Sequence, residues 1–168
     1  MAAGTTHAEK HPLCGASCTH GTKHPNDYYN NWLASDYGTD AKSLVLRVGG
    51  PNSIYGETLK TSGNAWVLPA GTYYLKDNIQ IDKSILIEGE VTICLNGHDI
   101  YIDKEDVAAF NVDRNTTVSE HGYLKLTDCQ ERERWGEITS KDTDKRGHGV
   151  VIINGKFHMY GGKIKGCR

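Results

Sequence analysis

Apolar and polar residues alternate over residues 90–95, which read Glu-Val-Thr-Ile-Cys-Leu. A two-residue period of this kind is typical of a β-strand with one buried face. Asn96-Gly97 is a turn dipeptide, and a second alternating run begins at Ile100. Because Cys94 has the opposite parity to its apolar neighbours, we expect its side chain to point away from the core.

Counted from Gly89, the alternating pattern returns at residues 122–127 and again at residues 155–160, each time 33 residues further along the chain. In this register, two columns of apolar residues follow, Val91, Leu124 and Phe157 in one and Ile93, Leu126 and Met159 in the other. The matching outward columns are Thr92, Lys125 and His158, and Cys94, Thr127 and Tyr160. A fixed period between 20 and 50 residues indicates a solenoid, in which each repeat buries its apolar edge against its neighbours.

Short apolar runs with polar corners between them continue from Trp66 to the end of the chain. We predict strands within residues 66–68, 72–75, 79–81, 85–87, 91–95, 100–102, 108–112, 123–127, 137–139 and 150–153. Strands this short suit the three-sided coil of a parallel β-helix, so the predicted fold class is all-β. Residues 129–135 and 141–148 are too polar for the core, and we expect them to be loops at the corners. One coil should return to Gly122 through residues 116–118.

The rest of the chain divides into two further parts. Residues 1–32 form a His/Cys-rich segment, and residues 33–65 a connecting or capping region in which residues 42–48 fit a strand, although residues 40–44 equally fit the start of a helix. The β-helix, residues 66–168, stops soon after its last repeat begins. An open end exposes apolar side chains and strand edges, so we expect the natural chain to continue or the end to meet a partner, including a second copy end to end.

Charge and composition exclude some classes of function. A chain of 168 residues with a net charge of −2 and interspersed signs offers no electrostatic basis for binding nucleic acid or an anionic membrane. No apolar run approaches the roughly 20 residues that a membrane-spanning helix needs. The first residues lack the charged and apolar regions of a secretory signal.

Histidine and cysteine are concentrated near the N-terminus. The spacing is that of a small zinc site, and zinc prefers four tetrahedral Cys and His ligands. We predict one structural zinc ion held by four of His11, Cys14, Cys18, His20 and His24, with His7 a weaker candidate. A segment this polar has almost no core, so the metal would supply the free energy that orders it. The alternative is an unstructured segment with or without a Cys14–Cys18 disulfide.

Several stretches of the chain stand out together: HPLCGASCTHGTKH, a tryptophan at position 32, LPAGTYYL, VTICLNGHDIYI, GYLKLTDC and FHMYGGKIKG. In this combination the chain resembles extracellular β-helix surface proteins of gut Firmicutes, and the resemblance covers residues 7–32 and 66–168. It implies a right-handed parallel β-helix of the pectate-lyase-like type and an extracellular or cell-surface location. It implies no activity, since these motifs are architectural.

Catalysis has to be weighed because β-helices also carry polysaccharide lyases and glycosidases. A lyase needs clustered carboxylates for calcium and a basic residue, and a hydrolase needs two carboxylates about 5–9.5 Å apart. Candidate residues are Asp99, Asp103, Asp128, Glu137, Asp142, Asp144, Lys125, Arg132, Arg134 and Arg146. They form no carboxylate ladder in the predicted register, and we find no nucleophile elbow or nucleotide motif. The histidines His98, His121 and His148 lie at turns or loop borders.

We therefore predict a non-catalytic binding or adhesion module whose ligand is a glycan or a host protein. Aromatic residues are frequent in binding hot spots, and Trp135, Tyr123 and Tyr160 are the predicted ligand-binding residues. Tyr28, Tyr29 and Trp32 are either part of such a surface or a cap on the N-terminal end of the solenoid. The alternatives are a fragment of a lyase or glycosidase, and a structural spacer.

Overall fold

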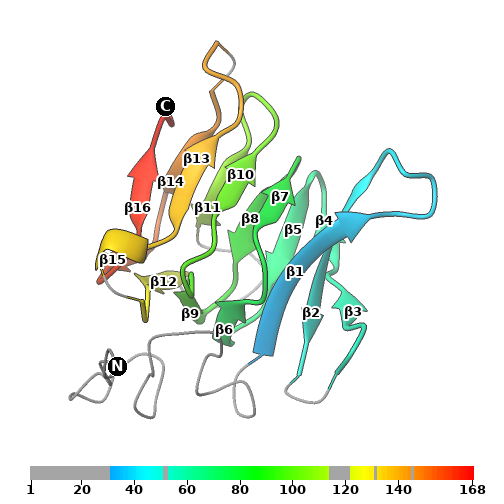
Figure 1. Cartoon of the computed structure of the whole chain (residues 1–168), viewed down its shortest axis with the longest axis horizontal. Coiled ribbons are helices and arrows are strands. Elements are labelled where there is room, and N and C mark those ends of the chain that lie inside the picture. Colours follow the sequence, from blue (N-terminus) through cyan, green and yellow to red (C-terminus); the bar gives the residue numbers. More distant parts are fainter. Residues whose placement is uncertain (1–30, 51–52, 114–121, 131, 145) are drawn as a thin grey trace, which may run out of the picture.

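The computed structural model describes residues 31–50, 53–113, 122–130, 132–144 and 146–168. In these residues the chain is all-β, and the one short helix is the 3-10 turn η1 (Arg132–Arg134) (Figure 1). The strands form three sheets, most of whose neighbouring strands are parallel. The all-β prediction is confirmed.

The three sheets contain seven, four and five strands. The seven-stranded sheet has the order β15 (Lys156–Met159), β12 (Tyr123–Thr127), β9 (Glu90–Cys94), β6 (Gly71–Leu75), β1 (Asn31–Tyr37), β2 (Leu44–Gly49) and β3 (Glu57–Thr58). The four-stranded sheet has the order β16 (Lys163–Lys165), β13 (Glu137–Ser140), β10 (Ile100–Ile102) and β7 (Ile79–Ile81). The five-stranded sheet has the order β14 (His148–Ile152), β11 (Ala108–Val112), β8 (Ser84–Ile87), β5 (Ala65–Leu68) and β4 (Thr61–Ser62).

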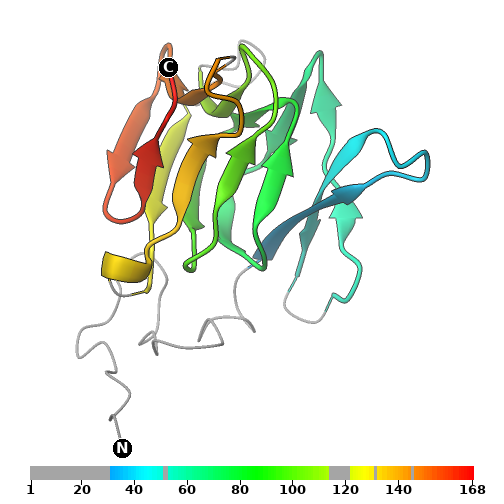
Figure 2. The same cartoon turned by 45° about the horizontal axis from the view of Figure 1, so that its top comes forward.

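From β5 onward the chain visits the three sheets in turn. It passes from the five-stranded to the seven-stranded to the four-stranded sheet and then begins again, so each strand pairs in parallel with the strand three positions later. We call one such circuit a rung: β6–β8, β9–β11, β12–β14 and, incomplete, β15–β16. The rungs lie side by side in Figure 2. This parallel-rich arrangement fits a β-solenoid.

The apolar columns predicted from the sequence are present in the strand register. Val91 pairs with Leu124, which pairs with Phe157, and Ile93 pairs with Leu126. The four residues of these columns in β9 and β12 have no exposed surface, because alternate side chains of all three sheets point into one shared core. The predicted runs at residues 72–75, 79–81 and 100–102 likewise lie within β6, β7 and β10.

The first two residues of the outward column Cys94, Thr127 and Tyr160 do not lie in solvent. Cys94 belongs to a separate apolar cluster with Trp32, Tyr74 and Cys129, and it is 1% exposed. Thr127, its neighbour in the register, is completely buried. The direction predicted for Cys94 is confirmed, but the expectation of an exposed outer face at Thr127 is wrong, because this part of the sheet is covered on both sides.

The region before the rungs is a set of antiparallel strands that covers the first rung. Residues 44–49 form β2, so the strand interpretation of residues 42–48 is confirmed and the helix is excluded. β1 pairs antiparallel with β2 from Trp32 to Tyr37 and pairs in parallel with β6 only over its first residues, Asn31–Leu33. β1 therefore begins in the seven-stranded sheet and then diverges from β6 toward β7, where Ser35 Oγ accepts the backbone N–H of Gln80 at 2.8 Å.

The two polar stretches predicted to be corner loops, residues 129–135 and 141–148, differ from each other. Residues 141–144 and Arg146 are exposed, as predicted for a corner loop. The stretch at residues 129–135 is a loop too, but Cys129 and Gln130 at its start are buried, which corrects the expectation that this stretch stays out of the core. Its polar groups are accommodated by hydrogen bonds to Asn96 in the turn of the preceding rung.

Candidate functional site

Tyr123 and Tyr160, two of the three predicted ligand-binding residues, are brought together by His158. The Nδ1 atom of His158 lies 3.0 Å from Tyr123 Oη and 3.3 Å from Tyr160 Oη. The imidazole meets both phenol rings edge to face, with ring centroids 5.3 and 6.1 Å apart. We call these three residues the Tyr-His-Tyr cluster. It lies on the outer face of the seven-stranded sheet, and Tyr160 is 53% exposed.

A cation borders this cluster. Lys125 is paired with His158 in the strand register, its Nζ lies 4.9 Å from the centroid of the Tyr123 ring, and it forms a salt bridge with Glu90. The hydrogen bond to Glu90 raises the pKa of Lys125. Partial loss of solvent around its hydroxyl raises the pKa of Tyr123. At neutral pH the cluster therefore offers phenol hydroxyls, aromatic edges and an ammonium group within a small area.

Trp135, the third predicted residue, lies elsewhere, in the loop between β12 and β13. Its indole N–H donates to the carbonyl oxygen of Gln130 at 3.0 Å, and the Arg132 guanidinium lies 5.9 Å from its ring centroid. The side chain is half-buried. These contacts brace the loop, so Trp135 is not part of the Tyr-His-Tyr cluster.

Trp32 is a capping residue. It is 4% exposed, and its indole N–H donates to the Ser53 carbonyl oxygen at 3.2 Å. Gly49 and Gly56 lie directly against its ring, where a Cβ atom would approach within 2.2 and 2.4 Å. Of the two sequence-based interpretations, the structure favours the cap.

The candidate catalytic carboxylates are largely engaged in contacts between rungs. Asp99 accepts the backbone N–H of Glu137 at 2.8 Å and the hydroxyl of Tyr101 at 3.0 Å, and this hydrogen bond raises the pKa of Tyr101. Asp103 accepts the side-chain amide of Gln80 and lies 3.4 Å from the Lys141 ammonium. Both carboxylates thus hold neighbouring rungs in register.

Asp128 is a buried carboxylate at the corner between β12 and β13. It is 3% exposed and accepts backbone N–H groups from Gly97, Gln130 and Gly136 at 3.1, 2.8 and 2.8 Å. Burial raises the pKa of Asp128, while these three donors lower it. Its oxygens are occupied by the backbone, so its role is to shape the corner.

An open acidic hollow of about 470 Å³ lies beyond the C-terminal ends of β10 and β13. Asp103, Glu105, Asp106 and Asp142 line it together with Lys104. Arg168 lies 3.6 Å from Asp106 and 3.9 Å from Glu105. Among the residues that the structure describes, no group of three or more His, Cys, Asp or Glu side chains is arranged to hold a metal ion.

The predicted zinc ligands lie outside the described residues. These are His11, Cys14, Cys18, His20 and His24, together with His7. Tyr28, Tyr29, His121 and the return through residues 116–118 also lie outside them.

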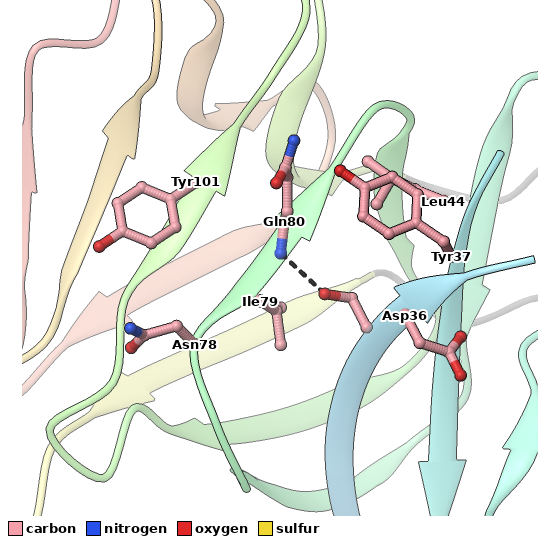
Figure 3. A pocket seen from close by; sticks show the side chains of 8 residues that line it. Asp36, Tyr37, Leu44, Asn78, Ile79, Gln80 and Tyr101 are labelled. Carbon is pink, nitrogen blue, oxygen red and sulfur yellow. Dashed lines mark hydrogen bonds between the residues drawn. The ribbon is translucent and has the colours of Figure 1, made fainter. Parts of the chain in front are cut away.

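A groove that the sequence analysis did not single out lies where the β1–β2 hairpin meets the four-stranded sheet. It has a volume of about 310 Å³, and Tyr37 and Tyr101 lie on either side of Gln80 within it (Figure 3). We call it the Tyr37–Tyr101 groove. The alternation in β7 and β10 places Gln80 and Tyr101 outward, but no local pattern indicated that Tyr37 would join them from a strand more than 40 residues earlier.

Comparison with protein-family models, with curated proteins and with solved structures found no match to this chain. In the part of the chain that the structure describes, no helix has the length and apolar character needed to cross a bilayer. The fold and the surface together define an all-β protein of parallel-rich sheets with two aromatic surface sites.

Proposed function

We propose that this chain is a non-catalytic binding module of an extracellular or cell-surface protein, built as a right-handed parallel β-helix of the pectate-lyase-like type. The strand order supports the architecture, since the chain visits three parallel sheets in turn. Connections between parallel strands of one sheet are right-handed in almost all proteins, which supports the proposed hand. The resemblance of the sequence motifs to surface proteins supports the location.

The observation that carries the binding function is the exposed Tyr-His-Tyr cluster beside Lys125. Buried aromatic residues are explained by the core, but Tyr160 is 53% exposed and His158 is exposed as well. Tyrosine supplies contact area together with a polar hydroxyl, which is why it is enriched in binding hot spots. A glycan or a host protein fits this combination of aromatic and cationic groups.

The lyase or glycosidase alternative has less support. The carboxylates Asp99, Asp103 and Asp128 are engaged by backbone or side-chain groups of neighbouring rungs. The carboxylate of Glu90, next to the cluster, is in a salt bridge with Lys125. A hydrolase needs two carboxylates facing one glycosidic bond.

A binding assay on immobilised mucin glycoprotein, pectin and heparin tests this proposal. We expect the full chain to be retained on at least one of them, and Tyr160→Ala to weaken that retention by about 1–4 kcal/mol. Tyr55→Ala is the matched control, because Tyr55 is 82% exposed and lies outside the cluster. Retention that both variants preserve would remove the cluster from the function, and no retention at all would favour a structural spacer.

The N-terminal His/Cys-rich segment is proposed to bind a structural zinc ion. The support is the spacing of His11, Cys14, Cys18, His20 and His24. Four protein ligands would close the coordination sphere, which leaves the metal no open position for catalysis.

A further inference from the structure

We infer that the Tyr37–Tyr101 groove binds a neutral pyranose unit of a glycan. Its two walls are aromatic: Tyr37, 57% exposed, comes from the end of β1, and Tyr101 comes from β10. Its apolar base contains Leu44 and Ile79, which are 6% and 0% exposed. A sugar ring has an apolar C–H face and a hydroxylated rim, and a site with aromatic walls and few polar groups matches both.

Two further lining residues, Asn78 and Gln80, supply polar groups that are already oriented. Gln80 uses its amide N–H to bond Asp103, so its carbonyl oxygen is left as an acceptor. Asn78 uses its carbonyl oxygen to accept the backbone N–H of Asp99 at 2.9 Å, so its amide N–H₂ is left as a donor. Asn78 directly precedes β7 and Gln80 lies within it, so one donor and one acceptor line the groove two residues apart and suit two hydroxyl groups of one sugar ring.

The groove is held in shape before any ligand arrives. The Tyr101 hydroxyl donates to Asp99, and Ser35 fixes the hairpin to β7 through the backbone N–H of Gln80. That second bond also argues against an extended peptide as the ligand. A peptide that added a strand to β7 would need the backbone donors of this edge, and Ser35 occupies the one at Gln80.

The charge of the lining selects among glycans. Of the residues that line the groove, Asp36 is the one with a formal charge, and it is paired with Arg47 at 2.9 Å. The carboxylates of Asp99 and Asp103 bond directly to its side chains Tyr101 and Gln80. An acidic surrounding without a lining Lys or Arg disfavours uronic acids and sulfated sugars, so the preferred ligand is neutral. One lining carboxylate is too few for glycoside hydrolysis, so the groove binds without cleaving.

This inference adds a second site and a class of ligand to the proposed binding function. It rests on the proposed function in one respect, namely that the protein binds its ligand without cleaving it. The two sites have no residue in common. Variants of Tyr37, in the groove, and of Tyr160, in the Tyr-His-Tyr cluster, therefore test the two proposals separately.

The test is a titration of the full chain with fluorescently labelled hexasaccharides, followed by anisotropy. The neutral probes are cellohexaose, mannohexaose, xylohexaose and maltohexaose, and the anionic probes are hexagalacturonate and a heparin hexasaccharide. We expect at least one neutral probe to bind, and Tyr37→Ala to weaken it about tenfold, the loss expected for one well-packed aromatic contact. Tyr37 is largely exposed, so the variant should fold.

Two further variants serve as controls for the effect of Tyr37→Ala. Tyr37→Phe should retain most of the affinity if the ring stacks on the sugar, and Tyr55→Ala, at an exposed tyrosine outside the groove, should bind as the wild type does. The inference is overturned if no neutral probe binds, if Tyr37→Ala leaves the affinity for the neutral probe unchanged, or if the probes that Tyr37→Ala weakens are the anionic ones. If Tyr160→Ala loses binding and Tyr37→Ala does not, the sugar binds at the Tyr-His-Tyr cluster. That result would reject the groove as the binding site and would support the proposed function.

Discussion

The Asp128 carboxylate accepts the backbone N–H of Gly97, 31 residues earlier in the chain, at 3.1 Å. Gly97 lies in the tight turn of the second rung with a φ of 73°, and Asp128 begins the corner of the third. The same carboxylate accepts the N–H of Gly136 at 2.8 Å, where that corner ends. One buried side chain therefore fixes the position of a long loop on the rung beneath it.

Asp128→Asn should destabilise the fold. An asparagine has one acceptor oxygen where the carboxylate has two, so at least one buried N–H among those of Gly97, Gln130 and Gly136 loses its partner. We expect a loss of about 1–3 kcal/mol in the free energy of unfolding, measured by urea titration. Asp144→Asn, in the exposed loop, is the control and should change it by less than about 0.5 kcal/mol.

The same pair of proteins tests the protonation of Asp128. Burial raises its folded pKa above the ordinary value of 3.8. The folded state then binds a proton at pH values where the unfolded chain has lost it, so stability from this group is largest in acid and falls as the pH rises through the folded pKa. The advantage of wild type over Asp128→Asn should therefore shrink as the pH rises from about 3.8 through the raised pKa of the folded state. An advantage that grows with pH would mean that the three N–H donors outweigh burial.

Gly136→Ala should be among the most damaging single substitutions. A Cβ atom at Gly136 would lie 1.9 Å from the carbonyl oxygen of His98 in the neighbouring rung, and backbone cannot move aside as a side chain can. We expect a loss of more than about 3 kcal/mol or a failure to fold, judged by circular dichroism and thermal unfolding. Gly50→Ala, whose nearest atom would be 3.9 Å away, should be tolerated. Equal effects would mean that these rungs are not packed this closely.

Leu126→Ala should remove about 2–5 kcal/mol, since its side chain has no exposed surface and ends in the shared core. The structure changes what is expected of the next residue. Alternation places Thr127 in an outward column, where truncation to alanine is normally almost neutral, but the side chain is fully buried, so Thr127→Ala should cost more than about 0.5 kcal/mol. Thr143→Ala, at an exposed position, takes its place as the control.

Much of the fold follows from the two-residue period and the 33-residue repeat. In a parallel sheet, a fixed repeat stacks like on like, so the pairing of Val91 with Leu124 and Phe157 can be predicted without further knowledge. The burial of Cys94 and Thr127 cannot be predicted from the repeat, because it depends on which residues cover the outer face of the sheet. The position of β1 cannot be predicted from the sequence pattern either, since β1 pairs with both β2 and β6 and the β1–β6 pairing joins segments that are distant in sequence.

The candidate sites show the same division. The outward direction of Lys125 and His158 follows from alternation, and Tyr160 was identified as a surface aromatic. The meeting of Tyr123 with Tyr160 through one histidine nitrogen depends on side-chain rotamers, which sequence patterns do not determine. For Trp135 the sequence predicts a ligand-binding residue, and it does not show that the indole N–H donates to the Gln130 carbonyl oxygen within the same loop.

The zinc prediction concerns the segment outside the described residues and has its own test. Elemental analysis of the full chain, purified without added metal, should find about one zinc ion per chain. A Cys14→Ser, Cys18→Ser double variant should lose it, while Cys167→Ser, at a half-buried position far along the sequence, should keep it. A Cys14–Cys18 disulfide detected by mass spectrometry under non-reducing conditions would contradict the prediction.

The central claim, that this protein binds its ligand without changing it, is tested by measuring retention and turnover in one sample. The full chain is incubated with pectin and with a glycosaminoglycan, with and without calcium, and both bound protein and ultraviolet absorbance of an unsaturated product are recorded. Retention on at least one polymer, weakened in Tyr160→Ala and without product formation, is the predicted result. Product formation that requires calcium and is abolished by Asp103→Asn would contradict the claim and establish a lyase.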